Sequence, residues 1–167
     1  LLQALSHLSS GYEKNKRIEE CFEKSKDRLT WQQVQLLLSG LSSNTHYPDS
    51  LNSKGPTQNR IAESYFNIKI AQIEPNIAVE IASKQSSGYN VNKIIELYFL
   101  ANKKVLSWPA VQVLLSGLSS NTYYAESHHS KGPTQNRIIL AWTECPLRCA
   151  PAVNGQPGTP TECPSRI

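Results

Sequence analysis

The sequence predicts an all-α protein built as a tandem duplication of a 77-residue unit with three to four helices per copy. Three observations support this prediction. Residues 9–61 align with residues 86–138 at a constant offset of 77, without a gap, and 34 of these 53 positions are identical. Apolar residues recur at helical spacing within each copy. No segment of strand length alternates cleanly between apolar and polar residues.

The alignment divides the chain into four parts. Residues 1–8 match the segment before the second copy only weakly. We expect them to be the last helix of a preceding unit in a fragment, because their Leu-rich start lacks the basic segment and cleavage site of a signal peptide. Residues 9–85 form the first unit, and residues 86–142 form a second, truncated unit. An irregular tail rich in proline, glycine and cysteine follows over residues 143–167, after a suspected non-native junction near Thr143.

The first helix of the complete unit is predicted over residues 15–27. Ile18 and Phe22 lie at helical spacing, and the mixture of Glu and Lys between them is typical of a solvated face. The second copy replaces part of that charged face with apolar side chains, which we expect to be buried between units or against a partner: Ile94, Leu97, Leu100 and Val105.

A second helix is predicted to follow a capping hydroxyl in each copy. Thr30 and Ser107 are suited to accept hydrogen bonds from the free amides of a first helical turn. Trp31 and Trp108 begin the same apolar stripe, so we expect them in equivalent buried positions. The stripe in the first copy consists of Trp31, Val34, Leu37, Leu38 and Leu41.

Glycine and proline predict the remaining boundaries. Gly40 and its counterpart Gly117 are expected to terminate the second helix. A third helix is expected to open at Pro56 and at Pro133, because proline suits the first turn of a helix. A fourth helix is predicted over residues 76–84.

The strongest candidate for function is the nonapeptide Ser-Lys-Gly-Pro-Thr-Gln-Asn-Arg-Ile, which occurs unchanged at residues 53–61 and 130–138. Free amides at a helix N-terminus attract anions, and Lys and Arg add positive charge. Gln, Asn and Arg also match base edges in the major groove of DNA. The predicted nucleic-acid-binding residues are therefore Lys54, Thr57, Gln58, Asn59, Arg60, Lys131, Thr134, Gln135, Asn136 and Arg137.

This helix loosely resembles the recognition helix of a helix-turn-helix protein. The resemblance covers the arrangement and the chemistry only, because about fourteen residues precede the third helix where that motif has three or four. The simpler interpretation is that Ser and Thr cap the helix, while Gln, Asn and Arg are solvated surface.

The loop before the nonapeptide is the second candidate. It reads Leu-Ser-Ser-Asn-Thr-x-Tyr-x-x-Ser in both copies. Tyr47 and Tyr124 are suited to stack on a base, and Asn44 and Asn121 are suited to hydrogen-bond to one. The alternative is that each tyrosine folds back onto its own core.

Composition and cysteine spacing exclude other classes of function. No apolar run approaches the ~18 residues that span a bilayer, so we expect no membrane partner. Cys145, Cys149 and Cys163 supply three thiols without an obvious fourth ligand, and His128 and His129 have no counterpart in the first copy, so we expect no metal or cofactor. No catalytic motif is present, so we expect no enzyme activity. Free thiols suit a reducing cytoplasm.

Two functions from different classes follow. The first is a module that binds nucleic acid, more specifically DNA, through the loop and third helix of each copy. Its weak point is the net charge of +4, which is low for such a domain. The alternative is a helical repeat scaffold that binds a protein, with the matched loops as a composite surface. A weaker third option is an anion or nucleotide site serving an enzyme domain outside this sequence.

Overall fold

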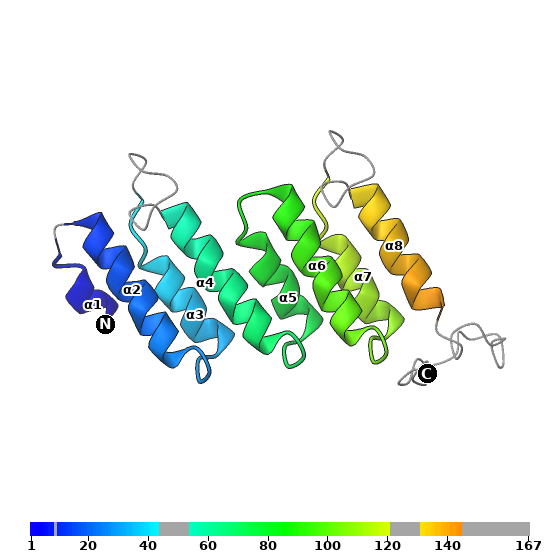
Figure 1. Cartoon of the computed structure of the whole chain (residues 1–167), viewed down its shortest axis with the longest axis horizontal. Helices are drawn as coiled ribbons and strands as arrows, with labels where there is room; N and C mark the ends of the chain where they lie inside the picture. Colours follow the sequence, from blue (N-terminus) through cyan, green and yellow to red (C-terminus); the bar gives the residue numbers. More distant parts are fainter. Residues whose placement is uncertain (9, 44–53, 121–130, 145–167) are drawn as a thin grey trace. The chain divides into compact units, whose positions relative to one another are not determined.

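The computed structural model describes residues 1–8, 10–43, 54–120 and 131–144, and every regular element in them is an α-helix. The all-α prediction is therefore confirmed, and these residues contain no strand. None of the described helices is both long enough and apolar enough to cross a bilayer. In chain order the helices are α1 (Leu2–Leu5), α2 (Gly11–Ser25), α3 (Trp31–Ser39), α4 (Lys54–Lys69), α5 (Pro75–Ser83), α6 (Gly88–Asn102), α7 (Trp108–Ser116) and α8 (Lys131–Thr143) (Figure 1).

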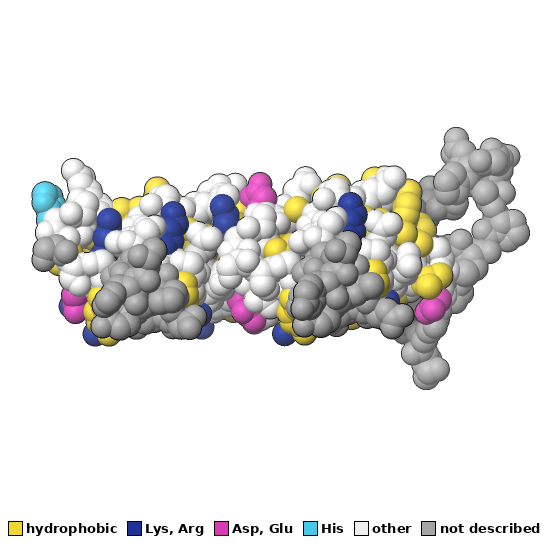
Figure 2. Space-filling model, turned by 90° about the horizontal axis from the view of Figure 1, so that it is seen from above, with side chains coloured by type: hydrophobic (Ala, Val, Ile, Leu, Met, Phe, Trp, Pro, Cys, Tyr) yellow, Lys and Arg dark blue, Asp and Glu magenta, His cyan; other side chains and the backbone are white. Residues whose placement is uncertain are grey.

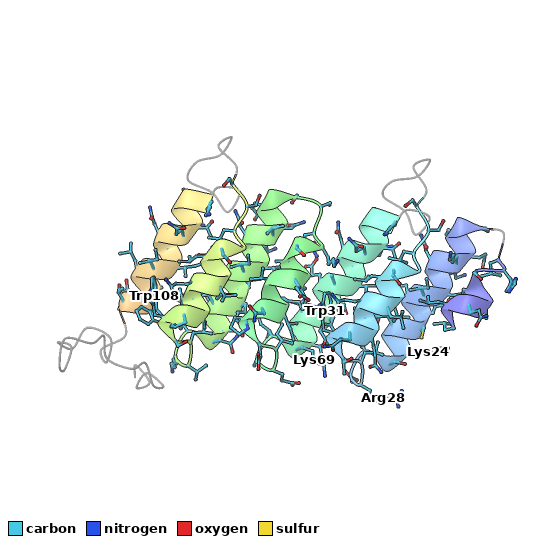
Figure 3. The ribbon with its side chains drawn as sticks, turned by 180° about the vertical axis from the view of Figure 1, so that it is seen from behind. Lys24, Arg28, Trp31, Lys69 and Trp108 are labelled. Carbon is cyan, nitrogen blue, oxygen red and sulfur yellow. The ribbon has the colours of Figure 1, made fainter. Side chains whose placement is uncertain are left out.

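By packing, the helices form two compact units, called unit 1 and unit 2 from here on. Their boundaries differ from those of the 77-residue repeats in the sequence. Unit 1 contains α1 to α4 together with residues 84–86, and unit 2 contains α5 to α8. In unit 1, α2 contacts α1, α3 and α4, and Figures 1 and 3 show α2 and α4 on one side with α1 and α3 behind them. In unit 2, α5 contacts α6 and α7, and α6 contacts α7 and α8. Each unit is thus a two-layered helical packet with its core between the layers.

The core of each unit consists of the apolar stripes that the sequence predicts. Its members in unit 1 are fully or almost fully buried: Ile18, Phe22, Trp31, Val34, Leu38 and Ile61. In unit 2 they include Ile81, Ile95, Phe99, Val111, Leu114 and Ile138.

Capping hydroxyls set the starts of the helices. The Thr30 side chain accepts from the backbone N–H of Gln33, and Ser107 accepts from that of Ala110, so both predicted N-caps are confirmed. The first predicted helix begins four residues earlier than expected, at Gly11, because Ser10 caps it. Helix α4 likewise begins at Lys54 rather than Pro56, and proline is tolerated there because first-turn N–H groups have no partner within the helix.

Gly40 and Gly117 cap α3 and α7 at their C-terminal ends, as predicted, but not by a left-handed turn. Both have φ of −86°, which any residue adopts. A Cβ at Gly117 would lie 2.7 Å from Val79 Cγ1, and one at Gly40 would collide with the side chain of Leu2. Close packing against α5 and α1, rather than backbone freedom, explains the two glycines.

The two predicted core tryptophans differ in burial. Trp31 is 3% exposed and packs on Tyr65 with ring centroids 5.7 Å apart. Trp108 packs on Trp142 at 5.2 Å but is only half-buried, so the prediction of equal burial is wrong (Figure 3). Helix α4 continues for four residues beyond Tyr65, whereas α8 ends one residue beyond Trp142.

Candidate nucleic-acid interface

The predicted nucleic-acid-binding residues of the nonapeptide lie in the first two turns of α4 and α8. Lys54 and Lys131 are the first residues of these helices. Thr57 and Thr134 are completely buried, and the other members of both sets are half-buried or exposed. The four predicted loop residues lie outside the described part of the chain: Asn44, Tyr47, Asn121 and Tyr124.

Arg60 of α4 is paired within unit 1. Its Nε donates to Glu19 Oε2 at 3.1 Å and its Nη2 donates to Glu19 Oε1 at 3.4 Å. The guanidinium therefore forms a bidentate ion pair with this carboxylate of α2. The same Nη2 donates to the Thr57 hydroxyl at 3.1 Å. The buried threonine therefore holds the arginine in the orientation that reaches the neighbouring helix.

Unit 2 repeats this cluster 77 residues later. Arg137 donates to the two carboxylate oxygens of Glu96 at 3.0 and 3.3 Å and to the Thr134 hydroxyl at 3.0 Å. The glutamate side chains are the less exposed partners, at 19% for Glu19 and 11% for Glu96. One pair links α4 to α2 in unit 1, and the other links α8 to α6 in unit 2.

These ion pairs weaken the case for phosphate binding by the two arginines. A phosphate at Arg60 or Arg137 would either displace the glutamate or lie beside its negative charge. Displacement would leave a largely buried carboxylate without its partner, which is costly. The unchanged Thr-Gln-Asn-Arg segment thus has a structural reason to recur.

Gln58 and Asn59 also make internal hydrogen bonds in unit 1. Gln58 Nε2 donates to the carbonyl oxygen of Lys84 at 3.2 Å, and Asn59 Nδ2 donates to the Ser86 hydroxyl at 2.9 Å. Gln85 Nε2 donates in return to the Asn59 carbonyl at 3.4 Å. The first turns of α4 therefore bind the segment of residues 84–86.

Sequence reasoning missed a buried asparagine clasp in each unit. Asn15 Nδ2 donates to the carbonyl oxygen of Ser42 at 2.9 Å, and the Ser42 N–H donates to Asn15 Oδ1 at 2.7 Å. Asn92 makes the same two bonds to Ser119, at 3.0 and 2.6 Å. Both asparagines are completely buried. The signal that could have revealed them is their identity in both copies within a helix where most other polar positions change.

A hollow of about 430 Å³ borders Arg60 between α2 and α4. Lys26, Ser64 and Asn67 also line it, together with Glu63 and Ile68. In the described part of unit 2, Leu140 and Ala141 stand where Glu63 and Ser64 line this hollow in unit 1. A polar binding site at this place is therefore not common to both units.

The face of the molecule seen in Figure 2 does not gather its positive charge in one patch. On the face seen in Figure 2, the Lys and Arg side chains of each unit stand singly among uncharged side chains and backbone. A nucleic-acid-binding surface normally gathers them in a continuous patch.

The described residues contain no group of three or more His, Cys, Asp or Glu side chains placed to hold a metal ion, and Cys21 is a free thiol. Burial, with a smaller contribution from Glu74, raises the pKa of Tyr98 to about 12, and its hydroxyl donates to the carbonyl oxygen of Ile73 at 2.8 Å. Burial also raises the pKa of Tyr65. Both pKa shifts occur at tyrosines that are buried in the core.

No family model, characterised protein or solved structure matches this chain.

Proposed function

We propose that this chain is a helical repeat scaffold, a tandem duplication of a 77-residue unit, that binds a protein partner. The repetition of contacts supports the duplication. Helices α2 and α6 begin and end 77 residues apart, as do α3 and α7, and the asparagine clasp and the arginine–glutamate pair recur at the same offset. Helical repeats offer extended surfaces for binding other proteins.

The observation that carries the proposal is an apolar outer face on α6 and the turn after it. Leu97 is 40% exposed, Leu100 is 48% exposed and Val105 is 59% exposed, while the fourth predicted member of this face, Ile94, is buried. Unit 1 has charged residues at the matching places, namely Glu20, Glu23 and Arg28. The same helix position therefore tolerates charge in one copy and carries leucine in the other, so folding of the unit does not require the leucines.

The charges around this face indicate the chemistry of the partner. Lys93 lies one helical turn before Leu97, and Lys103 and Lys104 lie along the chain between Leu100 and Val105. The only carboxylate on α6, Glu96, is paired with Arg137. A hollow of about 430 Å³ lies beside Leu100 and Val105. These features suit a protein segment that combines apolar and acidic side chains.

The test is binding of a synthetic amphipathic helix with leucines on one face and glutamates beside them. Fluorescence anisotropy should show binding of this peptide to the full chain and none of its lysine counterpart. The double variant L97E/L100E should lose the binding at least about tenfold while keeping its helical circular dichroism, since unit 1 has Glu at both places. The matched control E20Q/E23Q in unit 1 should bind normally. Binding that is equal in both double variants would contradict the proposal.

Nucleic-acid binding is the second candidate, and one observation favours it. The hollow beside Arg60 has Lys26, Ser64 and Asn67 as possible donors to an anion, with the carboxylate of Glu63 beside them. Lys54 and Lys131 are the first residues of their helices. The double variant E19Q/E96Q would weaken the ion pairs that bind Arg60 and Arg137. If these bind phosphate, the variant should bind mixed-sequence DNA more tightly, and R60A/R137A should bind it more weakly with a flatter salt dependence. Absence of DNA and RNA binding by all three proteins at ~50 mM salt would eliminate this candidate.

We also propose that the protein works in the cytoplasm, without catalysis and without a bound cofactor. The free thiol of Cys21 is compatible with that compartment. Thiol-reactive labelling in intact cells, compared with labelling after lysis under reducing conditions, tests the assignment.

A further inference from the structure

We infer that the hollow between α2 and α4 in unit 1 binds a free α-amino acid with an uncharged polar side chain. This function is separate from the scaffold function proposed above, because the hollow lies in unit 1 and the apolar face on α6 lies in unit 2. Neither proposal depends on the other.

The hollow has the size and the polar lining of a site for a small ligand. Its volume is about 430 Å³, within the range of about 300–1,000 Å³ that is usual for small-molecule sites. The residues that α4 contributes recur at the spacing of a single helix face. All of the lining residues belong to unit 1, and five of the six are polar: Lys26, Arg60, Glu63, Ser64, Asn67 and Ile68.

Arg60 presents fixed donors at this hollow. Its Nε and Nη2 bind Glu19, and its Nη2 also binds the hydroxyl of the buried Thr57. The remaining nitrogen, Nη1, has no hydrogen-bond partner in the part of the chain that the structure describes. Two N–H groups are therefore available to a ligand, and the contacts with Glu19 and Thr57 orient the guanidinium before a ligand binds.

The charges beside the hollow favour a ligand without net charge. Arg60 is paired with Glu19, and Lys26 Nζ lies 3.0 Å from Glu23 Oε2. Glu63 is exposed and has no ion-pair partner among the described residues. Two cations and three carboxylates leave one negative charge, which repels an anion such as phosphate. A zwitterion brings its own ammonium group, which Glu63 attracts.

The spacing of Arg60 and Glu63 matches the two charged groups of an amino acid. Residues three apart on a helix have Cβ atoms about 5–6 Å apart, so both side chains reach groups on the same carbon atom. The α-carboxylate of the ligand accepts from Arg60 Nη1, and its α-ammonium donates to Glu63. Ser64 and Asn67 lie one and two turns beyond Arg60 on the same face, and their hydroxyl and amide suit a polar side chain such as that of glutamine.

Unit 2 indicates that the fold does not require these polar residues. Leu140 and Ala141 occupy the positions of Glu63 and Ser64 in α8. Arg137 nevertheless makes the same ion pair and the same threonine contact as its counterpart in unit 1. Glu63 and Ser64 are therefore available for a ligand, and the residues of unit 2 supply substitutions that this kind of helix accepts.

A nuclear magnetic resonance titration of the full chain with L-glutamine tests the inference. Two-dimensional ¹H–¹⁵N spectra should show shifts of the amides of residues 60–68 that saturate with a Kd between about 0.1 and about 10 mM. N-acetyl-L-glutamine lacks the ammonium group and L-glutamine amide lacks the carboxylate, so each should bind at least about tenfold more weakly. L-glutamate should also bind more weakly than L-glutamine, because it adds a negative charge.

Substitutions of Glu63 identify the site. E63L introduces the leucine of unit 2, and E63Q removes the charge at nearly constant volume. Both variants should keep the far-ultraviolet circular dichroism of the natural chain and should bind L-glutamine at least about tenfold more weakly. The matched control is E20Q, which removes a carboxylate of α2 outside this hollow and should bind normally.

Three results would overturn the inference. The first is the absence of saturable shifts in residues 60–68 at about 50 mM L-glutamine, well above the expected Kd. The second is equal binding of L-glutamine and N-acetyl-L-glutamine, since the ammonium group would then have no partner. The third is unchanged affinity in E63Q, which would exclude Glu63 from the site.

Discussion

Replacing the buried asparagine of either clasp by alanine should be among the most destabilising polar substitutions in this protein. Asn15 and Asn92 each make two hydrogen bonds to the backbone that follows the third helix of their unit, with donor–acceptor distances between 2.6 and 3.0 Å. Both side chains are completely buried. Alanine removes the two bonds and leaves an N–H and a carbonyl of the partner serine without their partner.

The expected loss of stability follows from these contacts. A net hydrogen bond contributes about 1 kcal/mol, and a backbone group left unsatisfied adds about 1 kcal/mol or more. The partner serines are half-buried, so water satisfies part of what is lost. We therefore expect each variant to lose about 2–4 kcal/mol, which for a chain of this size lowers the melting temperature by roughly 5–15 °C.

Urea unfolding followed by circular dichroism measures the effect in N15A and N92A. The matched control is N67A, in which an exposed asparagine of α4 is replaced and the change should stay within about 0.5 kcal/mol. N15D should lose at least as much as N15A at neutral pH, because a carboxylate cannot donate to the Ser42 carbonyl. A loss below about 1 kcal/mol in both alanine variants would refute the reasoning from the two bonds.

Three further substitutions test the packing and the charges. E96Q should lose about 1–2 kcal/mol in urea unfolding and E19Q should lose less, because Glu96 is the less exposed carboxylate; the reverse order would contradict the assignment. Burial raises the pKa of Tyr98 to about 12, so the unfolded chain loses the phenol proton at a lower pH than the folded chain does. The free energy of unfolding should therefore fall as the pH rises from 10 toward 12. Y98F should remove a fall on the order of 2 kcal/mol, and a pH profile of stability that is unchanged in Y98F would contradict this prediction. G88A should destabilise by roughly 1–2 kcal/mol because its Cβ would lie 2.7 Å from Ser119 Oγ, with recovery in G88A/S119G; thermal unfolding of the two variants decides.

Local features of this protein could be predicted from the sequence because they depend on neighbouring residues. A hydroxyl that caps a helix contacts an amide three residues away, as Thr30 and Ser107 do. The apolar stripe of a helix repeats every three to four residues, so Ile18 and Phe22 identify both the helix and its buried face. The duplication is equally visible, because it is a comparison of the chain with itself.

The roles of the unchanged polar residues depended on the tertiary structure. The recurrence of Arg60 and Asn15 at the 77-residue offset is compatible with binding a ligand and with holding the fold. Arg60 meets its partner Glu19 41 residues away, and Asn15 meets Ser42 27 residues away. A side chain that can donate to a phosphate can donate equally well to a carboxylate, so its chemistry alone does not select the partner. Packing of α2 against α4 and against the segment after α3 brings these groups together, and that distance in space decides which bond forms.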